Sequence, residues 1–179
     1  IVFEREEDAR RVFDVLPKRF GKYGLTLHPE KTRLVPFQRP RHDAGGPGED
    51  GPQSFDLLGF THHWARSRKG YWIVKRRTSP SRFSRAVKAI REWCRRYRHL
   101  PVREQQVKLN RKLRGHCAYY GITGNASALS RFRYELIRAW RKWLNRRSQR
   151  ARMTWERFSN LLERHPIMPA RAVHSVLRT

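Results

Sequence analysis

The 179-residue sequence predicts an α+β fold, with a small β-rich part that contains a hairpin, followed by an α-helical bundle. Two observations support this prediction. Residues 55–77 alternate apolar and polar side chains around a glycine-containing loop, which is the period of two expected of strands. Residues 79–162 instead repeat apolar side chains at steps of three and four, which is the period of amphipathic helices.

The first 54 residues predict one helix, several short strands and a loop. Residues 4–22 form an amphipathic helical pattern with acidic residues in the first turn, where the helix dipole favours them. Pro17 is expected to kink or restart this helix, since proline removes a backbone donor. Residues 38–54 are rich in glycine and proline, which predicts a flexible surface loop. The short strands are expected at residues 1–3, 25–27 and 33–37.

Residues 55–78 predict a β-hairpin. Phe60, His62 and Trp64 alternate with smaller or polar neighbours, and residues 71–74 form a second β-branched and aromatic run. The polar loop between them ends in a glycine that can take a positive φ. Gly59 interrupts the first strand, which is typical of a bulge or of the close approach of another backbone.

Residues 79–150 predict three helices that pack as a bundle, and residues 151–179 predict a shorter fourth helix and a tail. Ser79 followed by Pro80 is a typical helix start, and Thr154 is expected to cap the fourth helix. Aromatic residues on the apolar stripes indicate core packing more than base stacking. The stripes consist of Phe83, Val87, Ile90, Cys94 and Tyr97; Val102, Gln106, Leu109, Leu113 and Tyr120; Leu129, Phe132, Leu136, Trp140 and Trp143; and Trp155, Phe158, Leu161 and Leu162.

Charge divides the chain in two. The sequence has 41 Lys and Arg against 15 Asp and Glu, a formal net charge of +26, yet residues 1–60 are neutral. Beyond residue 60, 31 basic residues are balanced by only five acidic ones. Such a field opposes folding unless a polyanion neutralises it, so we expect a nucleic-acid partner. An anionic membrane surface is the alternative, but no segment approaches the roughly 20 apolar residues needed to span a bilayer.

No catalytic or metal-binding constellation is visible in the sequence. The aspartates are scattered, with no Asp-Asp pair, and His62 and His63 are expected on opposite faces of a strand. No glycine-rich phosphate loop occurs. Cys94 and Cys117 both fall in apolar helical patterns, which predicts reduced, buried thiols. The residues themselves therefore indicate binding rather than catalysis.

Three ordered blocks carry a resemblance to a known family. They are GLTLHPEKTRLVPF at residues 24–37, FDLLGFTHHW with KGYWIVKRRTS at residues 55–64 and 69–79, and KLRGHCAYYGITGN at residues 112–125. These blocks resemble group II intron reverse transcriptase/maturases in order and spacing. The resemblance implies that residues 1–37 are the C-terminal part of the polymerase palm, that residues 55–78 form the primer-grip hairpin, and that residues 79–150 form the thumb, or maturase-specific (X), region.

One departure from the family limits what the resemblance implies. The Tyr-x-Asp-Asp box that binds catalytic Mg²⁺ in the family is missing from this sequence, as are the fingers and the rest of the palm. We expect those parts upstream in the same polypeptide, so this chain needs no cofactor and is inactive as a polymerase on its own. The implied partners are group II intron RNA and an RNA/DNA primer–template, in support of RNA splicing and RNA-directed DNA synthesis. The implied location is the bacterial cytoplasm, associated with nucleic acid and not with a membrane.

The resemblance also names candidate binding residues. Leu58, Gly59 and Phe60 match the primer grip, and Lys31 resembles a family lysine near the active site. The remaining candidates share a basic side chain placed off the apolar stripes, at or after the hairpin. These are Arg66, Arg68, Lys69, Lys75, Arg76, Arg77, Arg85, Lys88, Arg111, Lys112, Arg114, His116, Arg138, Arg141 and Lys142.

Two other functions stay open at this point. A stand-alone, non-enzymatic RNA-binding splicing factor has the same sequence features from Arg66 onward. A DNA-binding or integrase-like protein is the weaker alternative, and a preference for duplex DNA over structured RNA distinguishes it.

Overall fold

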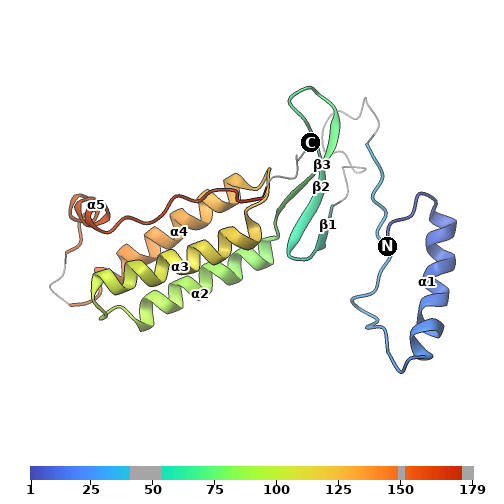
Figure 1. Ribbon diagram of the computed structural model, residues 1–179, viewed down its shortest axis with the longest axis horizontal. Helices are drawn as coiled ribbons and strands as arrows, with labels where there is room; N and C mark the ends of the chain where they lie inside the picture. The colour runs from blue at the N-terminus through green and yellow to red at the C-terminus, as the bar shows by residue number, and fades with distance from the viewer. Residues whose placement is uncertain (41–53, 149–151, 175–179) are drawn as a thin grey trace. The chain divides into compact units, whose positions relative to one another are not determined.

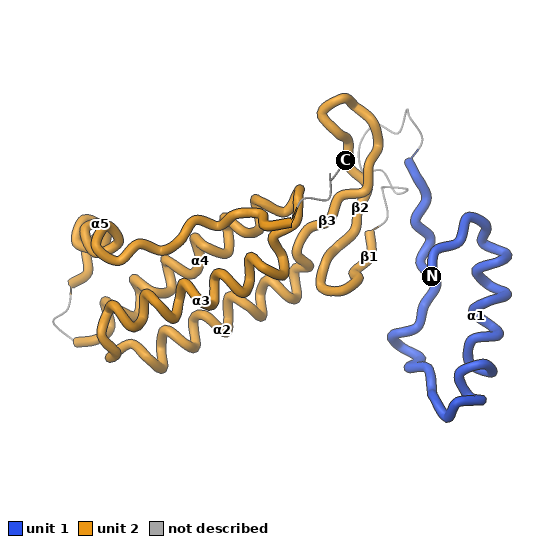
Figure 2. Tube along the Cα trace, in the orientation of Figure 1, with its two compact units in different colours: residues 1–53 blue, residues 54–179 orange. Residues whose placement is uncertain are grey.

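The computed structural model describes residues 1–40, 54–148 and 152–174. The chain divides into two compact units, Ile1–Gln53 and Ser54–Thr179 (Figure 2). The described residues form five α-helices and one three-stranded sheet (Figure 1), which confirms the predicted α+β class. Most of the loop predicted at residues 38–54 lies outside the described residues.

The first unit contains helix α1, Glu6–Gly21. Its first turn carries Glu6, Glu7 and Asp8, and Glu6 pairs with Arg10 at 2.6 Å, one turn later. Pro17 lies inside the helix, which continues past it rather than restarting. The helix is amphipathic, yet none of its residues is buried, so the described part of this unit has almost no core of its own.

The strands predicted in the first unit are wrong. Residues 1–3, 25–27 and 33–37 belong to no strand, and all the strands of the described chain lie at residues 54–78. A β-branched or apolar run favours extended backbone, but a strand exists only where a neighbouring strand completes its hydrogen bonds. The described residues of this unit provide no such neighbour. The β-rich part of the chain is therefore the hairpin region and not residues 1–37.

The difference in burial between the two units predicts a difference in hydrogen exchange. We expect backbone amides of residues 1–37 to exchange quickly and those of residues 83–143 slowly, because protection follows buried, cooperative packing. Exchange of the full chain, followed by mass spectrometry at peptide resolution, measures both regions in one sample. Equal protection in the two regions would show that the first unit is stable by itself.

The sheet is antiparallel in the order β1-β2-β3, with β1 at Ser54–Leu57, β2 at Phe60–Arg66 and β3 at Trp72–Thr78. The predicted hairpin is β2–β3, paired from Phe60↔Thr78 to Arg66↔Trp72. Its loop contains Gly70 at φ +81°, as predicted. Strand β1 is an addition that the alternation did not reveal, and it pairs with β2 as far as Leu57↔Phe60.

Gly59 lies in a turn and not in a bulge. Leu58 and Gly59 are the two residues between β1 and β2, and their φ angles are 50° and 80°. Positive φ at both positions is the geometry of a type I′ turn, whose twist matches that of the strands it joins. The close approach expected at Gly59 comes from a side chain, because a Cβ there would lie 3.1 Å from the Tyr120 hydroxyl oxygen. Leucine is disfavoured at positive φ, so the turn places a strained apolar residue at the tip.

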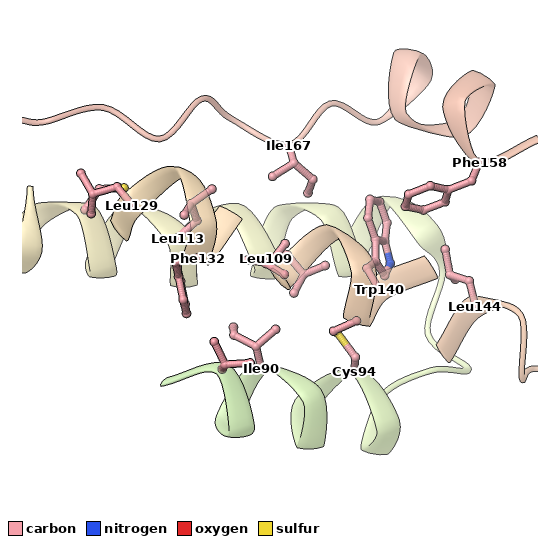
Figure 3. Close-up of a cluster of buried hydrophobic side chains, with 14 residues drawn as sticks. Ile90, Cys94, Leu109, Leu113, Leu129, Phe132, Trp140, Leu144, Phe158 and Ile167 are labelled. Atoms are coloured by element: carbon pink, nitrogen blue, oxygen red, sulfur yellow. The ribbon is translucent and has the colours of Figure 1, made fainter. Parts of the chain in front are cut away.

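The second unit continues with α2 (Pro80–Arg96), α3 (Val102–Tyr120) and α4 (Ala126–Leu144). Helix α4 packs against both α2 and α3 (Figure 1). The predicted apolar stripes form the core of the helical bundle, in which Leu109, Leu113, Leu129 and Trp140 are completely buried (Figure 3). Helix α4 ends at Leu144. Cys94 and Cys117 are free and buried, as predicted, and burial raises the pKa of Cys94 to about 12.

A buried glutamine joins the three helices. Gln105, and not the predicted Gln106, points inward with 1% of its surface exposed. Its Nε2 lies within 3.0 Å of the carbonyl oxygens of Tyr97, Arg98 and Leu100, which follow α2. Its Oε1 accepts a hydrogen bond from the Trp140 indole at 2.8 Å. Both polar ends are thus satisfied inside the core, which burial requires.

Helix α5 (Trp155–Arg164) begins as predicted, with the Thr154 hydroxyl accepting a hydrogen bond from the Arg157 N–H at 3.2 Å. After it, the chain runs in extended form back along the bundle (Figure 1). Asn110 fixes this segment, since its side chain donates to the Pro166 carbonyl and accepts from the Met168 N–H. Ile167 is buried, and His174 forms a parallel bridge with Ile122.

Candidate nucleic-acid interface

The tip of the β1–β2 turn is attached to the end of α3. The Tyr119 hydroxyl donates to the Leu58 carbonyl at 2.9 Å, and the Phe60 ring stacks on Tyr119 and meets Tyr120 edge-on. The Leu58 side chain is nevertheless 75% exposed. The three predicted grip residues therefore differ in their surroundings. Leu58 is the exposed tip of the turn, Gly59 is the second turn residue, and Phe60 packs against Tyr119 and Tyr120. The fold thus holds an exposed apolar side chain on a turn whose position is fixed by the hydrogen bond to Tyr119.

Asn125 ties the sheet to the bundle. It is 1% exposed and lies between α3 and α4. Its side-chain carbonyl accepts from the Thr78 N–H at 3.0 Å, and its amide donates to the Thr78 hydroxyl and to the Tyr120 carbonyl, both at 2.8 Å. These bonds join the end of β3 to the end of α3, so the turn and the basic helices are held in one geometry. Sequence reasoning missed this residue, because an asparagine before a helix is ordinarily read only as a cap.

The basic residues of α3 predicted to bind RNA are on its outer face. Arg111, Lys112 and Arg114 are all exposed, on either side of the buried Leu113. The Lys112 ammonium lies 5.7 Å from the centre of the Trp93 ring, which is partly buried against the core. This cation–π contact restrains the lysine without neutralising it. The face is therefore positively charged and partly ordered.

Most other predicted cations are also exposed, on the hairpin and on the outer faces of α2 and α4. Lys31 is also exposed, but it belongs to the first unit and not to the unit that contains the hairpin and the bundle. Lys75 and Arg76 are half-buried, and the Lys75 ammonium donates to the Arg66 carbonyl within the hairpin. The exposed residues are Arg66, Arg68, Lys69, Arg77, Arg85, Lys88, Arg138 and Lys142.

Arg141 and His116 have packing roles. The Arg141 guanidinium lies 3.9 Å from the Trp155 ring centre and donates to the Met153 carbonyl at 2.9 Å, so it fastens α5 to α4. The His116 ring lies between Phe132, at 3.8 Å between ring centres, and Tyr120, at 4.7 Å. Burial lowers the pKa of His116 to about 4, so its imidazole is neutral at pH 7. At pH 7 His116 therefore offers no cation to a phosphate, whereas Arg141 keeps its charge while it packs on Trp155.

The depressed pKa of His116 also affects stability. Its ordinary pKa is 6.5, so between that value and about 4 the unfolded chain binds more protons than the folded one. The contribution of the neutral His116 imidazole to the free energy of unfolding is therefore fully present above pH 6.5. It is lost as the pH falls toward 4.

A scan against protein-family models found that residues 83–161 match the group II intron, maturase-specific domain. The helical bundle is similar to this domain. The match spans nearly all of α2, all of α3 and α4, and the first part of α5. It confirms the resemblance found in the sequence and supports a function related to group II intron maturases. Searches of the curated proteins and of the solved structures found no match.

The surface of the matched residues 83–161 differs from an ordinary solvated surface in the uniform sign of its charge. Residues 83–161 contain only four acidic residues, Glu92, Glu104, Glu135 and Glu156. Cations also surround partly buried aromatic rings, as where Arg95, Lys142 and Arg146 all lie within 6.0 Å of the Trp143 ring centre. Such a surface can hold a chain of phosphates, whose affinity is dominated by Lys and Arg contacts.

Nothing in the described part of the chain brings a metal site together. Residues 1–40, 54–148 and 152–174 contain no group of three His, Cys, Asp or Glu side chains that could hold a metal ion. Among the same residues, no helix combines the length and the apolar character needed to cross a bilayer.

Proposed function

We propose that this chain binds group II intron RNA and an RNA/DNA primer–template through its maturase-specific domain, as the RNA-binding part of a reverse transcriptase/maturase that supports splicing and RNA-directed DNA synthesis. The observation that carries the proposal is the exposed, nearly single-sign cationic surface on a domain of this family. Phosphate contacts position the nucleic acid and supply most of the affinity. The Leu58–Gly59 turn would then lie beside the bound duplex, where an apolar tip can touch the sugar and base of a primer end.

The test is a competition among three nucleic acids of equal length. The full chain is first bound to a labelled, folded intron RNA domain, and binding is followed by fluorescence anisotropy. Unlabelled RNA of the same kind, duplex DNA and an RNA/DNA hybrid are then added separately as competitors. The proposal predicts that folded RNA and the hybrid compete at least as well as duplex DNA. A clear preference for duplex DNA would contradict it and favour a DNA-binding protein. Binding of folded RNA without the hybrid would favour a stand-alone splicing factor.

The same proposal predicts that the isolated chain extends no primer. Two-metal phosphoryl transfer needs anionic ligands held close together, and this sequence has no adjacent pair of aspartates. A primer-extension assay on an RNA template with Mg²⁺ should therefore give no product above a protein-free control. Template-dependent incorporation by the pure chain would overturn the assignment of the chain as a binding part only.

A further inference from the structure

Glu135 is an unusual residue for its position. It is one of five acidic residues beyond residue 60, and it lies on α4 at the seam with α2, among cations. Its side chain is only 16% exposed, whereas Glu92, on α2, is 66% exposed. A carboxylate on a surface that binds phosphates opposes binding by its negative charge. The presence of a half-buried glutamate on this surface therefore calls for an explanation.

Glu135 holds two arginines, one on each helix. Its Oε2 accepts from the Arg91 guanidinium at 2.7 Å, and its Oε1 accepts from the Arg138 guanidinium at 3.2 Å. The two oxygens of one carboxylate thus fix two like charges next to each other, where they would otherwise repel. Tyr134 restrains one of them further, since the Arg138 guanidinium lies 5.5 Å from its ring centre.

The two arginines remain accessible after these contacts. The Arg91 side chain is 58% exposed and that of Arg138 is 54% exposed. A guanidinium has five N–H donors in a fixed fork, and the hydrogen bond to Glu135 uses one nitrogen of each arginine. The two arginines therefore present oriented guanidinium groups to solvent. Arg91, Arg138 and Glu135 together carry a net charge of +1. Orientation matters because a long side chain loses rotamer freedom when it binds, at about 0.5–1.5 kcal/mol each.

Stability alone does not account for the arrangement. Exposed ion pairs contribute about 0–1 kcal/mol each, so two of them add little to a core with so many buried side chains. Further cations continue along the same two helices, one turn away, at Lys88 on α2 and Lys142 on α4. Lys88 is also paired with an acid, Glu92, at 4.0 Å, but both of those side chains are well exposed. The central pair differs because its acid, Glu135, is only 16% exposed.

We propose that Arg91 and Arg138 form a phosphate-binding pair for the RNA backbone, and that Glu135 is the positioning residue that keeps the pair in its binding geometry. The site rests on the RNA binding proposed above and adds a location for it, on the α2–α4 seam. Arginine suits this role because its planar fork matches two phosphate oxygens at once. Glu135 acts through the arginines and makes no contact with the RNA.

The decisive experiment compares Glu135→Gln with Glu92→Gln in RNA binding by the full chain. Both substitutions remove one negative charge, so electrostatics alone predicts equal or tighter binding for both. If Glu135 positions the arginines, Glu135→Gln weakens binding at least about 5-fold, the effect of freeing two side chains at about 0.5 kcal/mol each. Glu92→Gln should bind as tightly as the unchanged chain or more tightly. Binding by Glu135→Gln as tight as by Glu92→Gln would overturn the inference.

A double-mutant cycle separates positioning from structural damage. In the Arg91→Ala/Arg138→Ala background, Glu135→Gln should cause no further loss, because the residues through which it acts are gone. A further loss of similar size there would contradict the positioning role. Should Glu135→Gln fail to fold by circular dichroism, Arg91→Lys/Arg138→Lys replaces it in the comparison. That variant keeps the charge and loses the fork, and we expect it to bind at least about 5-fold more weakly, whereas unchanged affinity would refute the site.

The outcomes also separate this inference from the proposed function. If the unchanged chain fails to bind folded RNA, the proposed function itself is wrong. If the unchanged chain binds and only the Glu135 and Arg91/Arg138 variants behave like Glu92→Gln, RNA binding stands and the α2–α4 seam is not its site.

Discussion

Replacing Leu109 and Leu113 together by alanine unfolds the helical bundle. Both side chains are completely buried, one helical turn apart on α3, at the centre of the core (Figure 3). A buried leucine-to-alanine change costs about 2–5 kcal/mol, because apolar contacts are lost and a cavity is left. A domain of this kind has a total stability of about 5–15 kcal/mol. The two changes share neighbours, so their sum is approximate, but together they remove most of the stability.

Urea unfolding followed by far-ultraviolet circular dichroism measures this effect. The matched control is Val107→Ala on the same helix, where the side chain is 49% exposed and the expected change lies within about 0.5 kcal/mol. A double variant that unfolds cooperatively at the same urea concentration as the unchanged chain would show that these leucines are not the core.

Raising the salt concentration from roughly 50 to 200 mM weakens RNA binding by about 10³- to 10⁵-fold if six to ten phosphates are contacted. The reason is counterion release, since each lysine or arginine that neutralises a phosphate frees a condensed cation. The described surface offers enough candidates, with exposed cations on the hairpin and on the outer faces of α2, α3 and α4. Only part of that surface can face one ligand, which limits the number of contacts to fewer than the cations present.

Anisotropy titrations at five or six salt concentrations give the slope of log affinity against log salt. A single-stranded RNA should give a shallower slope than a duplex, because its phosphates are less densely spaced. A slope near zero would mean that apolar contacts dominate, and the cationic surface would then have another purpose.

The helices of the bundle were predictable because their information is local. Each apolar stripe repeats at three and four residues over several turns, and the burial of Val87, Leu109, Phe132 and Phe158 follows it. The residues that lock the bundle were not predictable. Gln105 and Asn125 are polar, and their value depends on carbonyl and hydroxyl partners up to 47 residues away in the chain. No periodicity reports such a partner.

The strands were predicted less well than the helices, because strand formation depends on pairing with another part of the chain. Residues 25–27 and 33–37 have strand-like composition but form no strand, because pairing is a tertiary property. Strand β1 is short and was read as part of β2, since the Leu58–Gly59 turn has no Asn-Gly or Asp-Gly signature. The φ of Leu58 could be seen only in the structure.

The candidate interface was predictable in kind but not in detail. Charge counts along the chain correctly place the exposed cations on the hairpin and the bundle. They could not tell that Arg141 packs on Trp155, or that His116 is held neutral between rings. The Arg91–Glu135 pair joins residues 44 positions apart, so only the packing of α2 on α4 reveals it.

The measurement that tests the central claim most directly is the salt slope of an alanine variant at Arg111, Lys112 and Arg114, the exposed cations of α3. Its control removes the same charge from α1 with alanines at Arg11, Lys18 and Arg19, which are also exposed. If the helical bundle holds RNA phosphates, the α3 variant loses up to about three contacts, a fall in slope of about 2.7 at 0.9 per contact. The α1 variant should keep its slope. An unchanged slope for the α3 variant, or equal falls for both, would contradict phosphate binding on this face of the domain.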